Sequence, residues 1–211
     1  MKNKRSISVE FWCFVFKLLS YISIFWLIRK IIGKKDAGWW YNFVDIWVLA
    51  NLFGAIISVF LVKCLNLNII NVVVVGYGLI RVFEIIIYQI NVLLFDEYRS
   101  KLKGVEYKIR GYRRMIINLL SNFCEITFWF ASSYAVFLSS VSDSDMSISR
   151  LIFNSFTTMT TFGISNLSIK TETGLFILWF QSIAGLLMTL ISLSRFLGML
   201  PKVESMDEFE N

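Results

Sequence analysis

The chain has 211 residues, of which 56% are hydrophobic and only one is proline, and its formal net charge is +6. Several stretches exceed the roughly 18–20 apolar residues that cross a bilayer, which excludes a soluble globular domain and predicts an integral membrane protein. The positive charge does not indicate nucleic-acid binding, because Lys and Arg cluster between the apolar stretches, where they set membrane topology.

Neither catalysis nor a bound cofactor is expected. The chain contains no histidine, and its carboxylates are scattered along the sequence. Acid–base catalysis and zinc binding both need several such groups close together. The sequence therefore favours a protein that is not an enzyme.

The N-terminal region, 1–36, contains an apolar stretch at 11–32 that is long enough to span a membrane. Cys13, Lys17 and Ser20 recur on one helical face, with aromatic residues elsewhere, a pattern typical of an amphipathic helix on a membrane surface. Basic residues flank the stretch on both sides and predict that both of its ends are cytoplasmic. We therefore expect an interfacial helix that lies along, or dips into, the inner face of the membrane.

Four later stretches are long and apolar enough to cross the membrane as helices. The first two form a helical hairpin within 37–98, and the third and fourth belong to a second unit at 115–200. None carries Arg or Lys at every third position, as a voltage-sensing helix would. The expected spans are 41–63, 68–95, 115–139 and 174–200.

Charge between the spans predicts their orientation. The loop 99–114 carries seven Lys and Arg residues against one Glu, so it should be cytoplasmic and able to bind anionic lipid headgroups. The acidic tail, 201–211, then lies on the same side. The expected fold class is an all-α, multi-pass protein of the plasma membrane with both termini in the cytoplasm.

The connector between the last two spans changes character. Its segment 148–159 is amphipathic but too short to cross, and it leads into the stretch TTMTTFGISN, which begins at Thr157. Non-helical backbone at membrane depth is tolerated only where protein shields it or a water-filled cavity meets it. Threonine hydroxyls and backbone carbonyls can replace a cation's hydration shell, glycine lets carbonyls point inward, and the C-terminal end of a half-helix is partially negative. The pattern predicts a re-entrant pore helix followed by a filter.

The sequence TMTTFGISN, 158–166, resembles the selectivity-filter signature of potassium channels. The order helix, pore helix, filter, helix over about 115–200 is similar to the same superfamily. Thr161 matches the family's threonine and Gly163 its first glycine, which implies that these residues bind a monovalent cation, with K⁺ as the permeant ion. The resemblance also implies a homotetramer, because one chain supplies a single filter strand. The implied filter residues are Thr160, Thr161, Phe162, Gly163, Ile164, Ser165 and Asn166.

Four filter positions depart from the family's pattern. Phe162 stands in place of valine, Ile164 in place of the usual aromatic residue, Ser165 in place of the second glycine, and Asn166 in place of the acidic residue. Serine at a position that needs a positive φ costs on the order of 1–3 kcal/mol. We therefore expect a cation channel that is permeable to potassium with relaxed selectivity. The alternatives are a non-conducting scaffold or regulatory subunit that retains the pore fold, and an ordinary polar loop after an interfacial helix.

The last span offers two hinge candidates and one polar anchor. Gly185 or Gly198 could act as a hinge, although packing of a small residue against a neighbouring helix is an equal alternative. Gln181 is expected behind the pore helix, near Asn154 or Ser155.

Ionisable residues within the spans are costly in lipid and need partners. Arg81 and Glu84 are three residues apart and share one helical face. Glu125 lies on a polar stripe of the third span, and we expect it to pair with Arg81 or with the start of the basic loop. A role of these charges in gating or proton sensing is the alternative to structural pairing, and Asp45 is a further charge of this kind.

Overall fold

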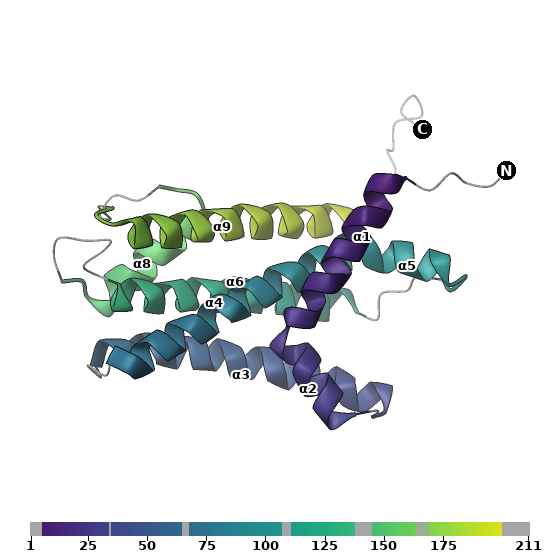
Figure 1. Cartoon of the computed structure of the whole chain (residues 1–211), viewed down its shortest axis with the longest axis horizontal. Coiled ribbons are helices and arrows are strands. Elements are labelled where there is room, and N and C mark those ends of the chain that lie inside the picture. Colours follow the sequence, from purple (N-terminus) through teal and green to yellow (C-terminus); the bar gives the residue numbers. More distant parts are fainter. Residues whose placement is uncertain are drawn as a thin grey trace, which may run out of the picture.

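The computed structural model describes residues 6–33, 35–64, 68–106, 111–137, 145–163, 167 and 169–199. Over these residues every regular element is a helix, and the longest helices run along the long axis of the molecule (Figure 1). Four helices are long and apolar enough to cross a membrane. The expectation of an all-α fold with four helices able to span a membrane is therefore confirmed.

The four span helices lie close to their predicted ranges. Each is longer than the roughly 20 residues that a bilayer requires, and an apolar helix satisfies its backbone hydrogen bonds internally, as lipid demands. The helices are α3 (Ala37–Cys64), α4 (Asn68–Ile90), α6 (Tyr112–Val136) and α9 (Glu172–Met199).

Helical structure enters the predicted loop 99–114 at both ends, and residues 107–110 in its middle lie outside the described residues. α4 passes through a π-helix, η2 (Asn91–Phe95), into α5 (Asp96–Leu102), so helical structure continues well into the predicted loop. The charges that suggested a loop stabilise the helix instead, because Lys101 Nζ lies 2.7 Å from Glu97 Oε1 one turn away. At the other end, α6 already includes the last three residues of the range.

The N-terminal region forms two helices rather than the single helix expected. α1 (Ile7–Leu19) continues into the short turn η1 (Ser20–Ile22), and this arm makes an angle of 70° with α2 (Ile24–Ile32) at Ser23. Ser23 causes the break, because its extended backbone stops one helix and its hydroxyl accepts a hydrogen bond from Trp26 N to begin the next. α1 consequently runs obliquely across the bundle (Figure 1).

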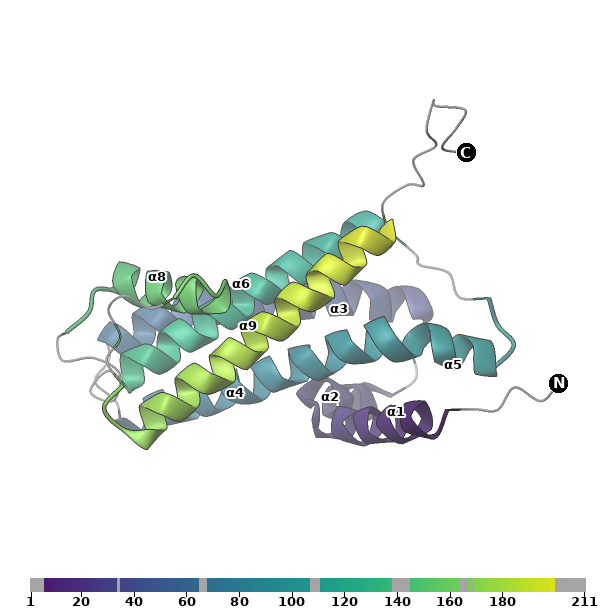
Figure 2. The same ribbon diagram turned by 90° about the horizontal axis from the view of Figure 1, so that it is seen from above.

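Helix α6 lies at the centre of the packing. α3 packs along it, and α4, α8 (Ile148–Met159) and α9 also contact it (Figure 2). The two helices of the expected hairpin at 37–98, α3 and α4, each pack more extensively against α6 than against each other. At one such contact Trp129 lies against Gly78, where a Cβ would be only 2.7 Å from the Trp129 ring.

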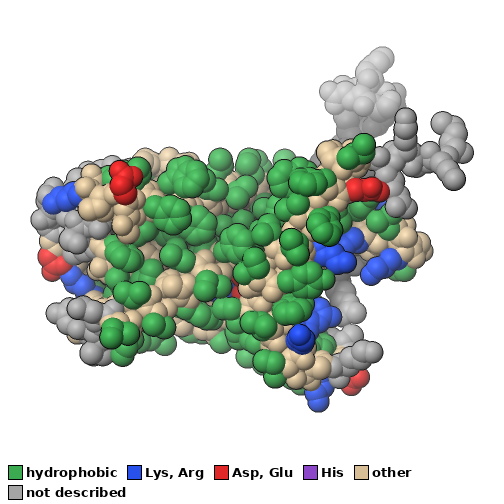
Figure 3. Space-filling model, viewed as in Figure 1, with side chains coloured by type: hydrophobic (Ala, Val, Ile, Leu, Met, Phe, Trp, Pro, Cys, Tyr) green, Lys and Arg blue, Asp and Glu red, His purple; other side chains and the backbone are tan. Residues whose placement is uncertain are grey.

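The surface has the character of a membrane protein. On the face shown in Figure 3, hydrophobic side chains cover the middle, and charged side chains gather toward the two ends. Large apolar residues on several spans are about half exposed or more, among them Ile46, Phe53 and Leu186. A continuous apolar surface of this size marks contact with lipid or with other protein.

Candidate functional site

Helix α8 has the bounds that the sequence predicted, 148–159. Ser147 begins it, because the Ser147 side chain accepts a hydrogen bond from Arg150 N at 3.4 Å. The outer face exposes Phe153 and Phe156, whereas the opposite face packs against α6 and α9. The buried face carries Leu151, Asn154, Ser155, Thr158 and Met159.

Buried hydrogen bonds hold α8 to both neighbouring spans. Gln181 on α9 donates from Nε2 to the Ser155 carbonyl and to Ser155 Oγ, both at 2.8 Å. Ser155 Oγ in turn donates to the Thr127 carbonyl of α6 at 2.7 Å. Tyr134 of α6 donates its hydroxyl to Gln181 Oε1. The predicted proximity of Gln181 and Ser155 is confirmed, and neither residue has any exposed surface.

Helix α8 ends beside the middle of α9. A Cβ at Gly185 would lie 2.4 Å from the Met159 carbonyl oxygen, so glycine permits the close approach of the two backbones. Gly185 is residue 14 of the 28 in α9, about 20 Å from its start at about 1.5 Å per residue. A Cβ at Gly198, the other hinge candidate, would meet no atom within 4 Å in the part of the chain that the structure describes.

The chain leaves α8 through a strained C-cap. Phe162 N donates to the Thr157 carbonyl at 3.0 Å, and Thr161 N donates to the Thr158 carbonyl at 3.2 Å, which is the Schellman pattern. The left-handed position of this motif is usually glycine, but here it is Thr161, with φ +61°. Positive φ is a genuine outlier for a β-branched residue and costs on the order of 1–3 kcal/mol. Gly163, with φ +92°, follows two residues later.

The threonine hydroxyls at this end of α8 bond back to the helix. Thr157 Oγ1 and Thr158 Oγ1 donate to the Asn154 carbonyl at 3.0 and 2.7 Å, and Thr160 Oγ1 donates to the Phe156 carbonyl at 2.9 Å. Each oxygen keeps lone pairs that can accept or coordinate. Carbonyl and hydroxyl oxygens are therefore concentrated at the partially negative end of a helix.

The structure describes only the first part of the predicted filter. Thr160 caps α8 and is half-buried, whereas Thr161, Phe162 and Gly163 are exposed, with 84% of the Phe162 surface accessible. The remaining predicted positions, 164–166, lie outside the described residues. The described part is an exposed, non-helical turn that begins where α8 meets the middle of α9.

A buried ion network joins α4 to α6. Arg81 Nη1 lies 2.6 Å from Glu84 Oε2, and Arg81 Nε lies 2.9 Å from Glu125 Oε1. At most 6% of the surface of any of the three residues is exposed. Trp129 Nε1 adds a hydrogen bond to Glu125 Oε1 at 3.3 Å. The structure thus brings together the three charges that the sequence singled out.

The N-terminal region contacts this network, which the sequence did not predict. Ser23 Oγ and Phe25 N both donate to Glu84 Oε1, the nitrogen at 2.8 Å. One arginine and two glutamates leave a formal charge of −1, and the partially positive start of α2 offsets the second carboxylate. Ser23 ahead of an apolar run was a sequence signal for a helix start. No sequence feature indicated that Glu84, 61 residues away, would be the hydrogen-bond partner of Ser23.

Asp45 has a partner at the start of α6. Arg114 Nε donates to Asp45 Oδ1 at 2.9 Å, and the Arg114 guanidinium lies 3.4 Å from the centroid of the Tyr41 ring. This half-buried pair ties the beginning of α6 to the beginning of α3. The sequence identified Asp45 as a charge within a span but not its partner.

Comparisons of the chain with models of known protein families, with curated proteins and with solved structures find no match. Within the described ranges, no three His, Cys, Asp or Glu residues group closely enough to hold a metal ion. The described residues form a helical protein with four helices long and apolar enough to cross a membrane, in which the short helix α8 ends beside the middle of one of them, α9.

Proposed function

We propose that this chain is the subunit of a cation channel that is permeable to potassium with relaxed selectivity. Four copies would surround one pore, and residues 157–166 of each copy would line it. The observation that carries the proposal is the exposed turn at 161–163, beside the middle of α9. Non-helical backbone at membrane depth is not stable against lipid, so protein or water must meet it. A ring of copies around a water-filled axis supplies both.

The chemistry of the turn suits a cation. The C-terminal end of α8 carries partial negative charge, and its oxygens can replace the hydration shell of a monovalent ion. Strained backbone is retained where function requires it, and Thr161 is strained in this way. In this proposal Thr161 and Gly163 contribute oxygens to a K⁺ site.

The proposed orientation places the end of the bundle that carries α5 in the cytoplasm of a cell bounded by a plasma membrane. Both chain termini would lie on that side, and the basic region 99–114 would contact anionic headgroups. The oblique α1 would lie along the inner face, where exposed aromatic side chains are favoured. Phe11, Trp12 and Phe14 of α1 are each more than half exposed, which supports that position.

The second candidate is a non-conducting scaffold or regulatory subunit with the same pore fold. The sequence departures favour it: Ser165 replaces the second glycine of the family's filter and Asn166 replaces its acidic residue. Such a protein would keep α8 and its hydrogen bonds but would not pass ions.

Reconstitution in a planar bilayer under opposed K⁺ and Na⁺ gradients tests the proposal. A reversal potential at or near the K⁺ equilibrium value supports potassium conduction, and a value between the two ion potentials supports relaxed selectivity. Absence of current over a wide range of voltage and pH favours the scaffold. Particles without four-fold symmetry down the membrane normal would contradict the proposed assembly.

A variant at the turn locates the conduction path. Thr161→Gly keeps a residue that adopts positive φ easily but removes the hydroxyl, so the protein should fold normally and its K⁺/Na⁺ permeability ratio should change. Thr173→Ala, at an exposed position in the first turn of α9, is the matched control and should leave the ratio unchanged. An unaltered ratio in Thr161→Gly would place the ion path elsewhere.

A further inference from the structure

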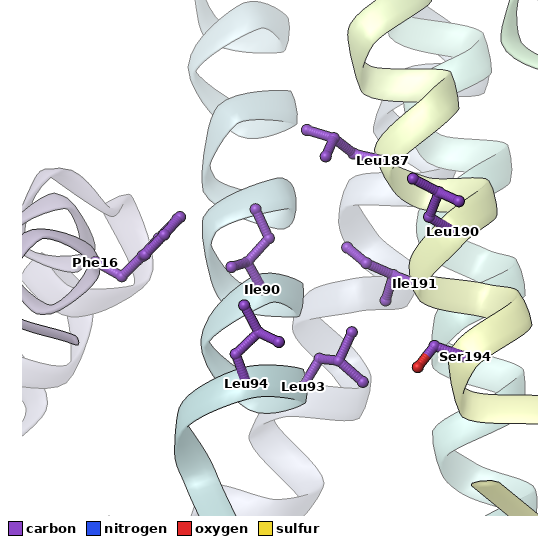
Figure 4. A pocket seen from close by; sticks show the side chains of 8 residues that line it. All are labelled: Phe16, Ile90, Leu93, Leu94, Leu187, Leu190, Ile191 and Ser194. Carbon is purple, nitrogen blue, oxygen red and sulfur yellow. The ribbon is translucent and has the colours of Figure 1, made fainter. Parts of the chain in front are cut away.

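An apolar cavity of about 390 Å³ lies between α1, the end of α4 with η2, and α9 (Figure 4). Seven of its eight lining residues are apolar, and the eighth is Ser194. Leu94 and Leu190, which line it from η2 and α9, are each more than half exposed. The cavity is therefore open to whatever surrounds the spans.

The wall contributed by α1 is fixed in place. Phe16 points from α1 toward Ile90 on α4 (Figure 4). Asn91 donates from Nδ2 to the Phe16 carbonyl at 3.2 Å, and the Phe16 and Phe95 rings lie 5.7 Å apart. The cavity is thus a preformed feature held by backbone and ring contacts.

Water is a poor occupant of this cavity. A buried water needs two to four polar partners, and one serine hydroxyl does not supply them. An unfilled space would forfeit the dispersion contacts of its lining. Acyl chains are the apolar molecules that surround the spans, so they are the available filling.

Two cations lie close to the residues that line this cavity: Lys17 is next to Phe16 in the chain, and Arg99 is hydrogen-bonded to Asn91 and Phe95 of η2. Lys17 follows Phe16 on α1 and is exposed. Arg99 on α5 has 34% of its side chain exposed and lies 3.8 Å from Asp96, which offsets one charge. Arg195 follows Ser194 on α9, but it is buried and donates to the Gln89 carbonyl at 3.5 Å, so Lys17 and Arg99 are the cations that a headgroup could reach. A surplus of positive charge beside an apolar space attracts an anionic lipid headgroup.

We infer that this cavity binds one acyl chain of an anionic phospholipid, with the headgroup near Lys17 and Arg99. The site would link α1 to α4 and α9 through the lipid. The inference depends on the four membrane helices and not on ion conduction, so it can fail or succeed independently of the proposed function.

Photolabelling of the wild-type protein locates the lipid. The probe is phosphatidylglycerol with a diazirine in its acyl chain, incorporated in bicelles with the full-length chain, and labelled peptides are mapped by mass spectrometry. Labels concentrated in 90–94 and 187–194 support the inference. Labels spread evenly over the lipid-facing residues of all spans would overturn it.

Two tryptophan variants separate cavity binding from general lipid contact. Leu190 and Leu193 are both 54% exposed on α9, but only Leu190 lines the cavity. Leu190→Trp fills the space and should abolish most labelling at 187–194, whereas Leu193→Trp should not. If Leu190→Trp instead alters the oligomeric mass in native mass spectrometry and leaves labelling intact, the cavity is an interface between copies and the inference is wrong.

A charge variant tests the headgroup. Lys17→Gln should lower labelling by phosphatidylglycerol about fivefold, the factor expected for one lysine near an anionic headgroup. Labelling by the matching phosphatidylcholine probe should not change. Lys35→Gln, an exposed lysine away from the cavity lining, is the control. Equal labelling by both lipids in the wild-type protein would overturn the anionic part of the inference.

Discussion

Replacement of Gly185 by alanine tests whether this glycine is a packing residue or a hinge. The new Cβ would lie 2.4 Å from the Met159 carbonyl oxygen, whereas real Cβ atoms essentially never come closer than 3.0 Å. The obstacle is backbone rather than a flexible side chain, so the two helices must move apart. A hinge glycine has no such obstacle, and alanine would simply strengthen the helix.

The change in unfolding free energy caused by Gly185→Ala is the difference between two opposing effects. Overpacking costs typically 1–3 kcal/mol, and a rigid backbone obstacle lies in the upper part of that range. Alanine in a helix interior gains back about 1 kcal/mol over glycine. The expected net loss is therefore about 1–2 kcal/mol, which corresponds to a fall in Tm of about 2–8 °C for a chain of this size.

Thermal unfolding in detergent, followed by tryptophan fluorescence, measures this shift, because the chain contains seven tryptophans. Gly198→Ala on the same helix is the control, since its Cβ would meet no described atom within 4 Å. Its Tm should be unchanged or slightly higher. If Gly185→Ala is as stable as the wild type or more stable, the close contact with α8 does not exist and the hinge interpretation is favoured.

Three further predictions concern polar interactions. Arg81→Leu leaves two buried carboxylates without their cation and should lower the unfolding free energy by about 3–5 kcal/mol. In thermal unfolding, the double variant Arg81→Leu with Glu125→Leu should recover part of that loss. A double variant no more stable than Arg81→Leu alone would contradict the pairing. Gln181→Leu leaves buried polar groups on α6 and α8 unsatisfied and should lower the unfolding free energy by about 2–4 kcal/mol. The rate of hydrogen–deuterium exchange in α8 should rise. An unchanged rate would contradict the role of Gln181 as an anchor of α8. The hydrogen bond from Lys63 holds the pKa of the Asp145 carboxyl below its usual range. This pair therefore stabilises the fold above the unfolded-state pKa of about 3.9 and loses its effect as pH falls through the folded-state pKa. The Tm difference between wild type and Asp145→Asn should be larger at about pH 7 than at about pH 2. An equal difference at both pH values would refute the ion pair.

The parts of the fold that sequence reasoning captured are those governed by local rules or by the cost of charge in lipid. The spans follow from runs of apolar residues, and α8 follows from the short amphipathic segment 148–159. The proximity of Arg81, Glu84 and Glu125 was predictable because an unpaired charge within a span is costly. The proximity of Gln181 to Ser155 followed from the expected position of the last span behind the short helix.

The features that were missed depend on contacts between distant parts of the chain. Neither proline nor glycine marks the break between α1 and α2, and the carboxylate of Glu84 that receives the start of α2 comes from another helix. The high density of charged residues in α5 suggested a loop, but the four-residue spacing of Glu97 and Lys101 favours a helix. The packing of α3 against α6 has no signal within either segment alone.

The π-helix η2 has a consequence for the rotational phase of everything that follows it. An α-helix turns by about 100° per residue, so one inserted residue rotates the subsequent helix by about that angle. Arg99 Nη2 donates to Asn91 Oδ1 at 2.7 Å, and this hydrogen bond connects α5 to the first residue of the π-helix. The azimuth at which α5 presents its basic side chains is thus set by a single residue. A one-residue deletion within 91–95 would swing that charged surface about a quarter of the way around the helix axis.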